Sequence, residues 1–359
     1  MYSVTKHQGF VPSAEYFKKQ VFAKDLSTYK VVEPNQFAYA TIHLDEGSIG
    51  FAPESCLVSP MYTVFDVDYS LVDRDYLFAF LKSERALRTY ASLGKGSAER
   101  RRSISLESLG RLPIPLPPLP EQRRIASILD RAKVLEEFAR DRAKALDELA
   151  MSLFVSRFGR AREWSVRWPS ARLDEVAETR LGKMLDKGRQ ADLEQWPYLR
   201  NANVQWMRFE LDDILTMGFD AKDRTEFVLE PGDVLVCEGG EPGRSAVWRG
   251  EISNVYFQKA LHRVRLNRDV MLPGFYVWVM RELAFSGHLA ESITAATIAH
   301  LTGVKLKALS LPVPPMAEQL AFVSEVETVS AMKSKNSDSI RVMGQLATTL
   351  SEQAFRGEL

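Results

Sequence analysis

Apolar residues recur at a seven-residue helical spacing over a long stretch near the middle of the chain, from Glu121 to Phe158. One series consists of Ile125, Ala132, Ala139, Leu146 and Leu153, and its companion of Ile128, Leu135 and Leu149. Because neither glycine nor proline interrupts the stretch, we expect one helix of about 55–60 Å, at about 1.5 Å per residue. A helix with so narrow an apolar stripe needs a partner helix.

A proline-rich run leads directly into this helix. The prolines between Leu112 and Leu119 favour extended backbone, because each lacks an N–H and restricts the residue before it. Pro120 is compatible with the first helical turn, and Glu121 places a carboxylate at the positive end of the helix dipole. We therefore expect the helix to begin where the prolines end.

The C-terminal part of the chain repeats this pattern after a shift of 197 residues. LSLPVPPMAEQLAFVSEVE, from Leu309, aligns without a gap with LPIPLPPLPEQRRIASILD, from Leu112. Further upstream, the same shift places Val67 on Val264 and Phe78 on Phe275. The sequence therefore indicates an internal duplication, in which a globular part is followed each time by a long helix.

The two long helices are predicted to pack against each other. The second stripe is weaker, with Asn336 and Ser339 at its middle. The expected helix-pair or subunit contacts are Ile125, Ile128, Leu135, Leu146, Leu149, Leu153, Phe322, Met332, Met343, Leu346 and Leu350.

The fold class expected from these patterns is α+β, a mixture of helices and short strands, with pseudo-two-fold duplication. The predicted domains are a first globular part (1–111), a first helical spacer (112–160), a second globular part (161–308) and a second spacer (309–359). The second globular part has about 34 residues, Trp164 to Pro197, before the point that aligns with Met1. We therefore expect the first globular part to be truncated at its N-terminus.

Local patterns within the globular parts predict several elements. Helices are expected from Asp73 to Leu93 and from Leu173 to Arg180. A strand pair is expected across the glycine-rich turn at Gly239 to Gly243, followed by a strand from Lys259 to Asn267.

Composition describes a globular protein without a membrane segment. Of the 359 residues, 45% are hydrophobic and 26% are charged, and no apolar run is long enough to cross a bilayer. The two cysteines, Cys56 and Cys237, fit buried thiols in a reducing compartment, so the expected location is the cytoplasm. With 47 basic and 47 acidic residues the net charge is zero, which argues mildly against a nucleic-acid partner.

Motifs for catalysis are missing from the sequence. There is no phosphate-binding GxxxxGK[ST], no GxGxxG after a strand, no HExxH and no paired CxxC. His262 and His300 fit structural or DNA contacts better than catalysis. The sequence therefore predicts a binding protein, with no metal site.

Polar loops supply the candidate binding residues. Guanidinium and amide groups, as in the segment from Arg200 to Gln205, can pair bidentately with guanine and adenine edges. The plainer alternative for each cluster is a solvated charge run. The candidate DNA contacts are Lys6, Lys95, Arg100, Arg101, Arg102, Lys183, Arg200, Asn201, Asn203, Arg244, Lys259 and His262.

The duplicated proline-to-helix segment resembles the specificity subunit of Type I restriction–modification enzymes over nearly the whole chain. PLPPLPEQRRIASILD is its most specific stretch, VPPMAEQ and QAFRGEL form the second copy, and EPGDVLVCEGGEPGR resembles the strand–hairpin of its recognition domains. The resemblance implies two target recognition domains, each reading one half of a bipartite, asymmetric site in double-stranded DNA. It also implies that the long helices pack antiparallel and set the distance between the half-sites.

The same resemblance implies that the chemistry belongs to partner subunits. Methyltransferase subunits, usually two, would dock on the helices and use S-adenosylmethionine, and a translocating restriction subunit would use ATP and Mg²⁺. The chain itself would bind no cofactor and would have no activity of its own.

The sequence is also compatible with other classes of protein. The chain could be the recognition subunit of a related system that cuts on both sides of a bipartite site. It could also be a coiled-coil scaffold that binds proteins and not DNA, and salt-sensitive DNA binding would exclude this class. An enzyme is the least favoured class, because the motifs above are missing.

Overall fold

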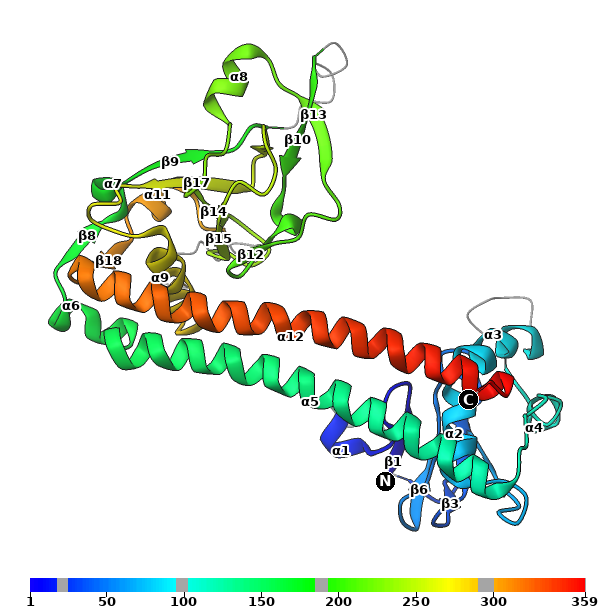
Figure 1. Ribbon diagram of the computed structural model, residues 1–359. Coiled ribbons are helices and arrows are strands. Elements are labelled where there is room, and N and C mark those ends of the chain that lie inside the picture. The colour runs from blue at the N-terminus through cyan, green and yellow to red at the C-terminus, as the bar shows by residue number, and fades with distance from the viewer. Residues whose placement is uncertain (18–24, 95–102, 185–192, 290–299, 359) are drawn as a thin grey trace. The chain divides into compact units, whose positions relative to one another are not determined.

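A computed structural model describes residues 1–17, 25–94, 103–184, 193–289 and 300–358. These residues form two compact units, each with one globular part and portions of both long helices (Figure 1). The first unit comprises Met1–Arg142 and Lys335–Leu359, and the second comprises Ala143–Ser334. Both units mix helices with short strands, which confirms the expected fold class.

Each long helix is continuous, and the two are antiparallel within each unit. Helix α5 spans Leu119–Phe158 (40 residues) and α12 spans Met316–Arg356 (41 residues). In the first unit, the Asn336 side chain donates to the carbonyl of Ala139 over 2.6 Å. In the second unit, the rings of Phe154 and Phe322 lie 5.4 Å apart, centroid to centroid. The predicted helix pair is thereby confirmed, and Asn336 is a fully buried polar member of its seam.

The predicted seam residues divide by exposure. Ile125 and Phe322 are buried, Leu146 and Leu153 pack partly buried against the core of the second unit, and Ile128, Met343 and Leu350 are half-buried. Four others are about half exposed and lie off the seam: Leu135 (53%), Leu149 (47%), Met332 (54%) and Leu346 (51%).

A buried glutamine attaches each long helix to its globular part. Gln122 accepts from the backbone N–H of Asp73 and donates to the carbonyls of Leu71 and Pro117, at 2.7–3.1 Å. Gln319 makes the same three bonds in the second unit, to Leu272 N–H and to the carbonyls of Val270 and Pro314, each 2.9 Å long. Because both side chains are almost fully buried, these bonds satisfy backbone groups that water cannot reach. The repeated PPxxEQ motif therefore fixes each helix to the N-terminus of a second helix, α2 (Arg74–Lys82) or α9 (Pro273–Phe285).

The main sheet of the second unit has four antiparallel strands in the order β15-β14-β17-β9. Its strands are β9 (Ala177–Leu181), β14 (Val234–Cys237), β15 (Ser245–Val247) and β17 (Leu261–Leu266). Helix α9 shares its core with α5 and α12, where Phe154 contacts the rings of Phe158, Trp164, Phe275, Trp278 and Phe322.

A smaller sheet of the second unit has the order β13-β10-β16 and its own core around Trp248 and Phe257. Its strands are β10 (Gln195–Leu199), β13 (Leu215–Gly218) and β16 (Tyr256–Phe257). The remaining elements are η2 (Ala161–Glu163), α6 (Trp164–Arg167), β8 (Ser170–Arg172), α7 (Leu173–Val176), η3 (Asn201–Asn203), β11 (Val204–Gln205), β12 (Arg208–Phe209), α8 (Ala221–Glu226), α11 (Gly303–Lys307) and β18 (Ser310–Pro312).

The first unit contains a three-stranded antiparallel sheet in the order β5-β4-β7. Its strands are β4 (Phe37–Ala40), β5 (Ile49–Phe51) and β7 (Tyr62–Phe65). The other elements are β1 (Tyr2–Thr5), β2 (Gly9–Pro12), α1 (Ser13–Tyr16), β3 (Lys30–Val32), β6 (Cys56–Val58), α3 (Glu84–Leu93) and α4 (Leu106–Leu109).

Strand pairing reveals the duplication in three dimensions and corrects its register. Phe37 on β4 corresponds to Val234 on β14 under the 197-residue shift, and they pair with Phe65 and Val264 respectively. Phe65, and not Val67, is therefore the counterpart of Val264. From β7 to the start of α2, equivalent residues of the two copies are therefore 199 positions apart. The shift is 197 again at Ile104, because its N–H donates to the carbonyl of Thr41 and the N–H of Leu301 donates to the carbonyl of Glu238.

Two predicted helices differ from the structure. The helix expected from Asp73 to Leu93 is two helices, because Ser83 ends α2 and caps α3 by accepting from the N–H of Ala86. The helix expected from Leu173 to Arg180 stops at Val176 and continues as β9, because pairing with β17 outweighs the helical propensity of this segment.

Candidate nucleic-acid interface

Three of the predicted DNA contacts meet in the second unit, where η3 lies against the glycine-rich turn between β14 and β15. The Asn201 side chain donates to the carbonyl of Gly239 over 3.0 Å. Arg244 donates to the carbonyl of Asn201 over 2.9 Å and pairs with Glu241 at 3.2 Å. Arg200 precedes η3 and pairs with the exposed carboxylate of Asp213. We call Arg200, Asn201 and Arg244 the loop cluster.

The loop cluster holds polar atoms that lack partners among the described residues. These are the Nε atoms of Arg200 and Arg244 and the Oδ1 atom of Asn201, all of them buried. Unpaired buried polar groups are uncommon in native proteins and mark sites where a ligand or water completes the bonding. The two guanidinium groups are also held by carboxylates at the surface, which a DNA phosphate or base can replace.

Asn203 and His262 are structural in this fold. Asn203 is 2% exposed; its side chain accepts from the N–H of Arg200 and donates to the carbonyls of Glu210 and Asp213. His262 is 1% exposed, with Nε2 3.2 Å from the carbonyl of Leu301, and burial lowers its pKa below the ordinary 6.5. Their burial leaves neither side chain free to reach a DNA groove, so both organise the loops that carry the exposed candidates.

Two further candidates, Lys183 and Lys259, lie next to each other in this unit. The Lys183 ammonium donates to the carbonyl of Gly218 over 2.7 Å, pairs with Asp223 and lies 4.9 Å from the centroid of the Phe219 ring. The exposed Lys259 is adjacent, because its backbone N–H donates to the carbonyl of Lys183 over 2.7 Å. Lys259 is thus open to solvent, whereas Lys183 is held by internal partners.

The candidates of the first unit are mostly outside the described residues. Lys95 and the three arginines at 100–102 fall in the segment 95–102, which the structure does not describe. Lys6 is exposed in the turn between β1 and β2, and its carbonyl accepts from the Lys82 ammonium over 2.7 Å.

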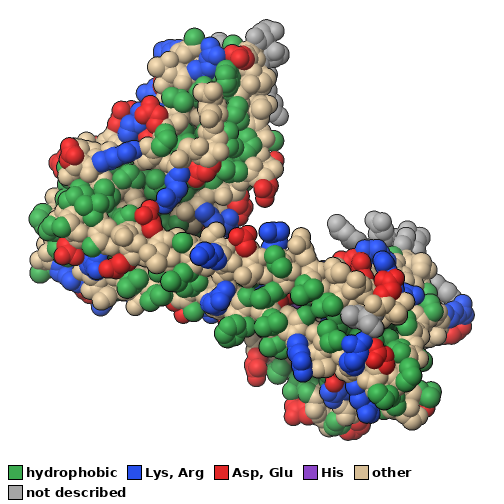
Figure 2. Space-filling view, viewed as in Figure 1, with side chains coloured by type: hydrophobic (Ala, Val, Ile, Leu, Met, Phe, Trp, Pro, Cys, Tyr) green, Lys and Arg blue, Asp and Glu red, His purple; other side chains and the backbone are tan. Residues whose placement is uncertain are grey.

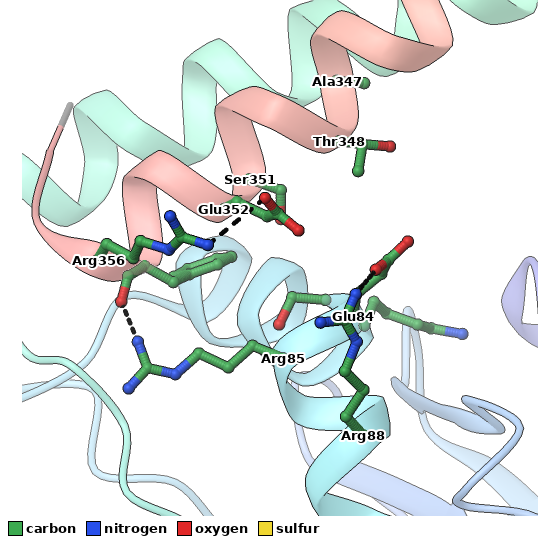
Figure 3. Close-up of a pocket in the computed structure, with 11 residues that line it drawn as sticks. Glu84, Arg85, Arg88, Ala347, Thr348, Ser351, Glu352 and Arg356 are labelled. Atoms are coloured by element: carbon green, nitrogen blue, oxygen red, sulfur yellow. Dashed lines mark hydrogen bonds and ion pairs between the residues drawn. The ribbon is translucent and has the colours of Figure 1, made fainter.

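A basic cleft in the first unit was not predicted from the sequence. Four basic and two acidic side chains line it, between the start of α3 and the end of α12 (Figure 3). Arg85 donates to the carbonyl of Phe355, Arg88 pairs with Glu84, and Arg356 pairs with Glu352. Burial lowers the pKa of Lys82 to about 8. The cleft joins segments about 270 residues apart, so no local pattern indicates it.

Elsewhere the charges are mixed. Figure 2 shows lysine, arginine, aspartate and glutamate side chains interspersed on the face in view. Among the described residues, no cluster of three His, Cys, Asp or Glu side chains could hold a metal ion, and no helix is long and apolar enough to cross a membrane. Cys56 and Cys237 are free and buried, and burial raises the pKa of the Cys237 thiol to about 11.

Comparison with known proteins finds similarity to one family. Residues 21–141 match the Type I restriction modification DNA specificity domain. The chain is 22% identical over 309 residues to the Type I restriction enzyme StySPI specificity subunit of Salmonella potsdam, covering 80% of this chain and 66% of that protein. The chain thus spans slightly under two thirds of the length of this relative.

Two solved structures share the fold. One, described as the structural basis of complex assembly and conformational transition of the type I R-M system, has a TM-score of 0.62 at 17% identity and covers 94% of this chain and 85% of its own. The S subunit of a Type I restriction–modification system from M. genitalium has a TM-score of 0.54 at 14% identity, covering 90% and 83%. These likenesses support the fold described above.

Proposed function

Since this chain belongs to the specificity subunits of Type I restriction–modification systems, we propose that it reads a bipartite, asymmetric site in double-stranded DNA and docks the subunits that act on it. Each unit reads one half-site, and the catalytic chemistry resides in the partners. The chain itself binds no cofactor; S-adenosylmethionine, ATP and Mg²⁺ act on the methyltransferase and restriction subunits.

The observation that carries this proposal is the repeated attachment of a globular part to a long helix through a buried glutamine. Three hydrogen bonds from Gln122 and three from Gln319 fix each globular part to the start of its helix. The helices themselves contain no proline after the first turn. Such a pair is suited to act as a ruler that keeps two half-sites at one spacing.

Docking of partner subunits is supported by apolar side chains that the helix pair leaves exposed. On α5, Val134 and Phe138 lie one turn apart and are 53% and 68% exposed. On α12, Val342 and Leu346 have the same spacing and are 54% and 51% exposed. Exposed apolar residues gathered on helices are typical of protein interfaces, and we assign them to methyltransferase subunits, two per chain, as the duplication suggests.

The loop cluster is the proposed base-reading site of the second unit. Arginine recognises guanine and asparagine recognises adenine through paired hydrogen bonds in the major groove. The neutral net charge means that much of the phosphate attraction comes from the partner subunits.

The test is DNA binding by the chain assembled with its methyltransferase partner. Arg200→Ala and Asn201→Ala should each relax base preference in one half-site only, costing about 1–3 kcal/mol per lost bidentate contact. Arg249→Ala is the matched control, because Arg249 is an exposed arginine of the same unit paired with Glu327 at 3.4 Å. An equal loss of affinity for all sequences would instead make the tested residues phosphate contacts, and no loss in either variant would remove them from the interface.

A further inference from the structure

Lys82, the last residue of α2, joins two turns of the first unit. Its ammonium donates to the carbonyls of Thr5 and Lys6 over 3.3 and 2.7 Å, and to the carbonyl of Gly47 over 2.6 Å. Thr5 and Lys6 lie where β1 turns into β2, and we call residues 6–8 the first hairpin turn. Gly47 lies between β4 and β5, in residues 41–48, which we call the first sheet turn. All three N–H donors of the ammonium are thus used by backbone carbonyls.

The first sheet turn is equivalent to the glycine-rich turn between β14 and β15, residues 238–244, which we call the second sheet turn. Gly47 and Gly243 have left-handed backbones, with φ of +89° and +87°. In each turn, the carbonyl of the residue after this glycine accepts from the last N–H of the preceding strand, β4 or β14, at 2.9 and 2.8 Å. The residue in question is Arg244 in the second unit and Ser48 in the first.

The hairpin β1–β2 is equivalent to the hairpin β11–β12. The first packs against β5, and the second packs against β15. In the second unit, Trp206 of the hairpin turn donates from Nε1 to Glu241 of the second sheet turn over 2.6 Å. Glu241 also pairs with Arg244 of the loop cluster, so the two turns and the loop cluster are joined by side chains. The first unit joins the same two turns through Lys82.

The residue that corresponds to Lys82 also supports its hairpin turn. Under the 199-residue shift of α2, Lys82 corresponds to Arg281 on α9. The Arg281 guanidinium lies 5.5 Å from the centroid of the Phe285 ring, which is itself 5.8 Å from the ring of Trp206. A cation at one position of the helix therefore supports the hairpin turn in both units, directly in the first and through an aromatic pair in the second.

The turns that Lys82 joins carry exposed polar side chains. Lys6, His7 and Gln8 are exposed on the first hairpin turn. On the first sheet turn, the exposed side chains of His43 and Glu46 pair at 3.2 Å. Lysine can donate to guanine, glutamine can pair with adenine and a carboxylate can accept from cytosine. The two turns thus have the side-chain types that read base edges, at the place that corresponds to the loop cluster.

We propose that Lys82 is the positioning residue of the first unit, which holds the hairpin turn and the sheet turn together so that their exposed side chains read the first half-site. This inference rests on the proposed function above. Lys82 itself does not contact DNA, because its three donors are used within the fold. Without the ammonium, the hairpin turn is free to move relative to the sheet turn, and base preference in the first half-site is lost.

The protonation state of Lys82 offers a way to weaken this contact without a substitution. Burial, with a smaller effect of Lys133, lowers its pKa to about 8, so the ammonium loses its proton as the pH rises from 7 to 9. At pH 9 only about one tenth of the molecules keep the charge, and the neutral amine is a weaker donor. In the second unit, the guanidinium of Arg244 and the indole of Trp206 keep their protons over this range.

Other charged groups surround Lys82. The cleft beside it and the elements packed against it contribute Lys133 from α5, Glu84, Arg85 and Arg88 from α3, Glu352 and Arg356 from α12, and the exposed charges of the two turns.

Methylation by the chain assembled with its methyltransferase partner tests the proposal. The substrate is DNA from host cells that lack this gene, and sequencing of the product reports both half-sites from one reaction. From pH 7 to pH 9, the preference of the native complex for the bases of the first half-site should fall about five- to tenfold, with the second half-site unchanged. Lys82→Arg should keep this preference at both pH values, because a guanidinium stays charged and can donate to the same carbonyls.

Substitution by methionine provides the second measurement. Lys82→Met should relax the first half-site already at pH 7, and it should be the half-site that Arg200→Ala leaves unchanged. Lys30→Met is the matched control, because the Lys30 ammonium also donates to a carbonyl, that of Tyr62 over 2.6 Å, which lies outside both turns. This variant should behave as the native complex does at both pH values.

The outcomes separate this inference from the proposed function. The absence of any split motif with the native complex would overturn both. A split motif whose first half-site changes neither with pH nor in Lys82→Met would overturn the role of Lys82 alone. An equal loss of methylation at all sequences, without relaxed bases, would make Lys82 a residue of general stability and overturn its positioning role. The pH comparison of the native complex decides the matter if Lys82→Met does not fold.

Discussion

Replacing Gln319 with leucine should weaken the second unit while leaving the first unit unchanged. The change removes three hydrogen bonds from a side chain that is 0% exposed, without creating a cavity, because leucine is of similar volume. Because each of the three backbone groups would stay buried without a partner, at a cost of about 1–3 kcal/mol each, the free energy of unfolding should fall by at least about 3 kcal/mol.

Tryptophan fluorescence can report this loss selectively. All six tryptophans lie in the second unit, so their emission during urea unfolding follows that unit alone. The midpoint should fall with little change in the denaturant slope. Gln122→Leu removes the three equivalent bonds from the first unit and is the matched control; it should lower the stability seen by far-ultraviolet circular dichroism without moving the tryptophan transition.

Two results would refute the reasoning. A loss below about 1 kcal/mol in Gln319→Leu would mean that the backbone groups find other partners, so that the glutamine is not the attachment point. An equal shift of the tryptophan transition by Gln122→Leu would mean that the two units unfold together.

The remaining predictions concern pH and the helix pair. Burial lowers the pKa of His262, with smaller effects from Glu238 and Lys307, so the unfolded chain takes up a proton near pH 6.5 whereas the folded chain does not. The stability of the second unit should therefore fall as the pH drops below 6.5, and His262→Gln should make this fall less steep in the tryptophan assay. An unchanged loss of stability at acid pH in His262→Gln would exclude His262 as its source. Inserting one heptad at residues 143–149 of α5, with a matching heptad in α12, should lengthen the DNA spacer between the half-sites and leave the bases of the half-sites unchanged. Methylation sequencing measures both the spacer and the bases. An unchanged spacer length would contradict the proposal that the helix pair sets the distance between half-sites.

The long helices and the duplication could be predicted because their signals are local and repeated. The apolar spacing from Ile125 to Leu153 and the PPxxEQ motif are readable in one dimension. The role of Gln122 cannot be predicted from the sequence, because its partner Asp73 lies 49 residues away and only folding brings the two residues together. The two-residue change of register at β7 is likewise visible only in the strand pairing.

The sequence alone indicates candidate binding residues but not how the fold uses them. Polar residue type indicates which side chains can bind DNA bases, but not which are already used within the fold. Asn203 and Arg200 are close in sequence and both can form hydrogen bonds, yet Asn203 is fully engaged by backbone groups, whereas Arg200 keeps a buried Nε without a partner among the described residues. The basic cleft at Arg85 and Arg356 has no sequence signal, because it forms where α3 meets α12.

Single-molecule methylation sequencing of host DNA tests the recognition role most directly. The measurement compares cells that carry this gene and its methyltransferase partner with cells in which this gene alone is deleted. We expect a split adenine motif, with two half-sites at one fixed spacing, that disappears on deletion and returns on complementation. A methylation pattern that is the same with and without the gene would contradict a role in reading DNA.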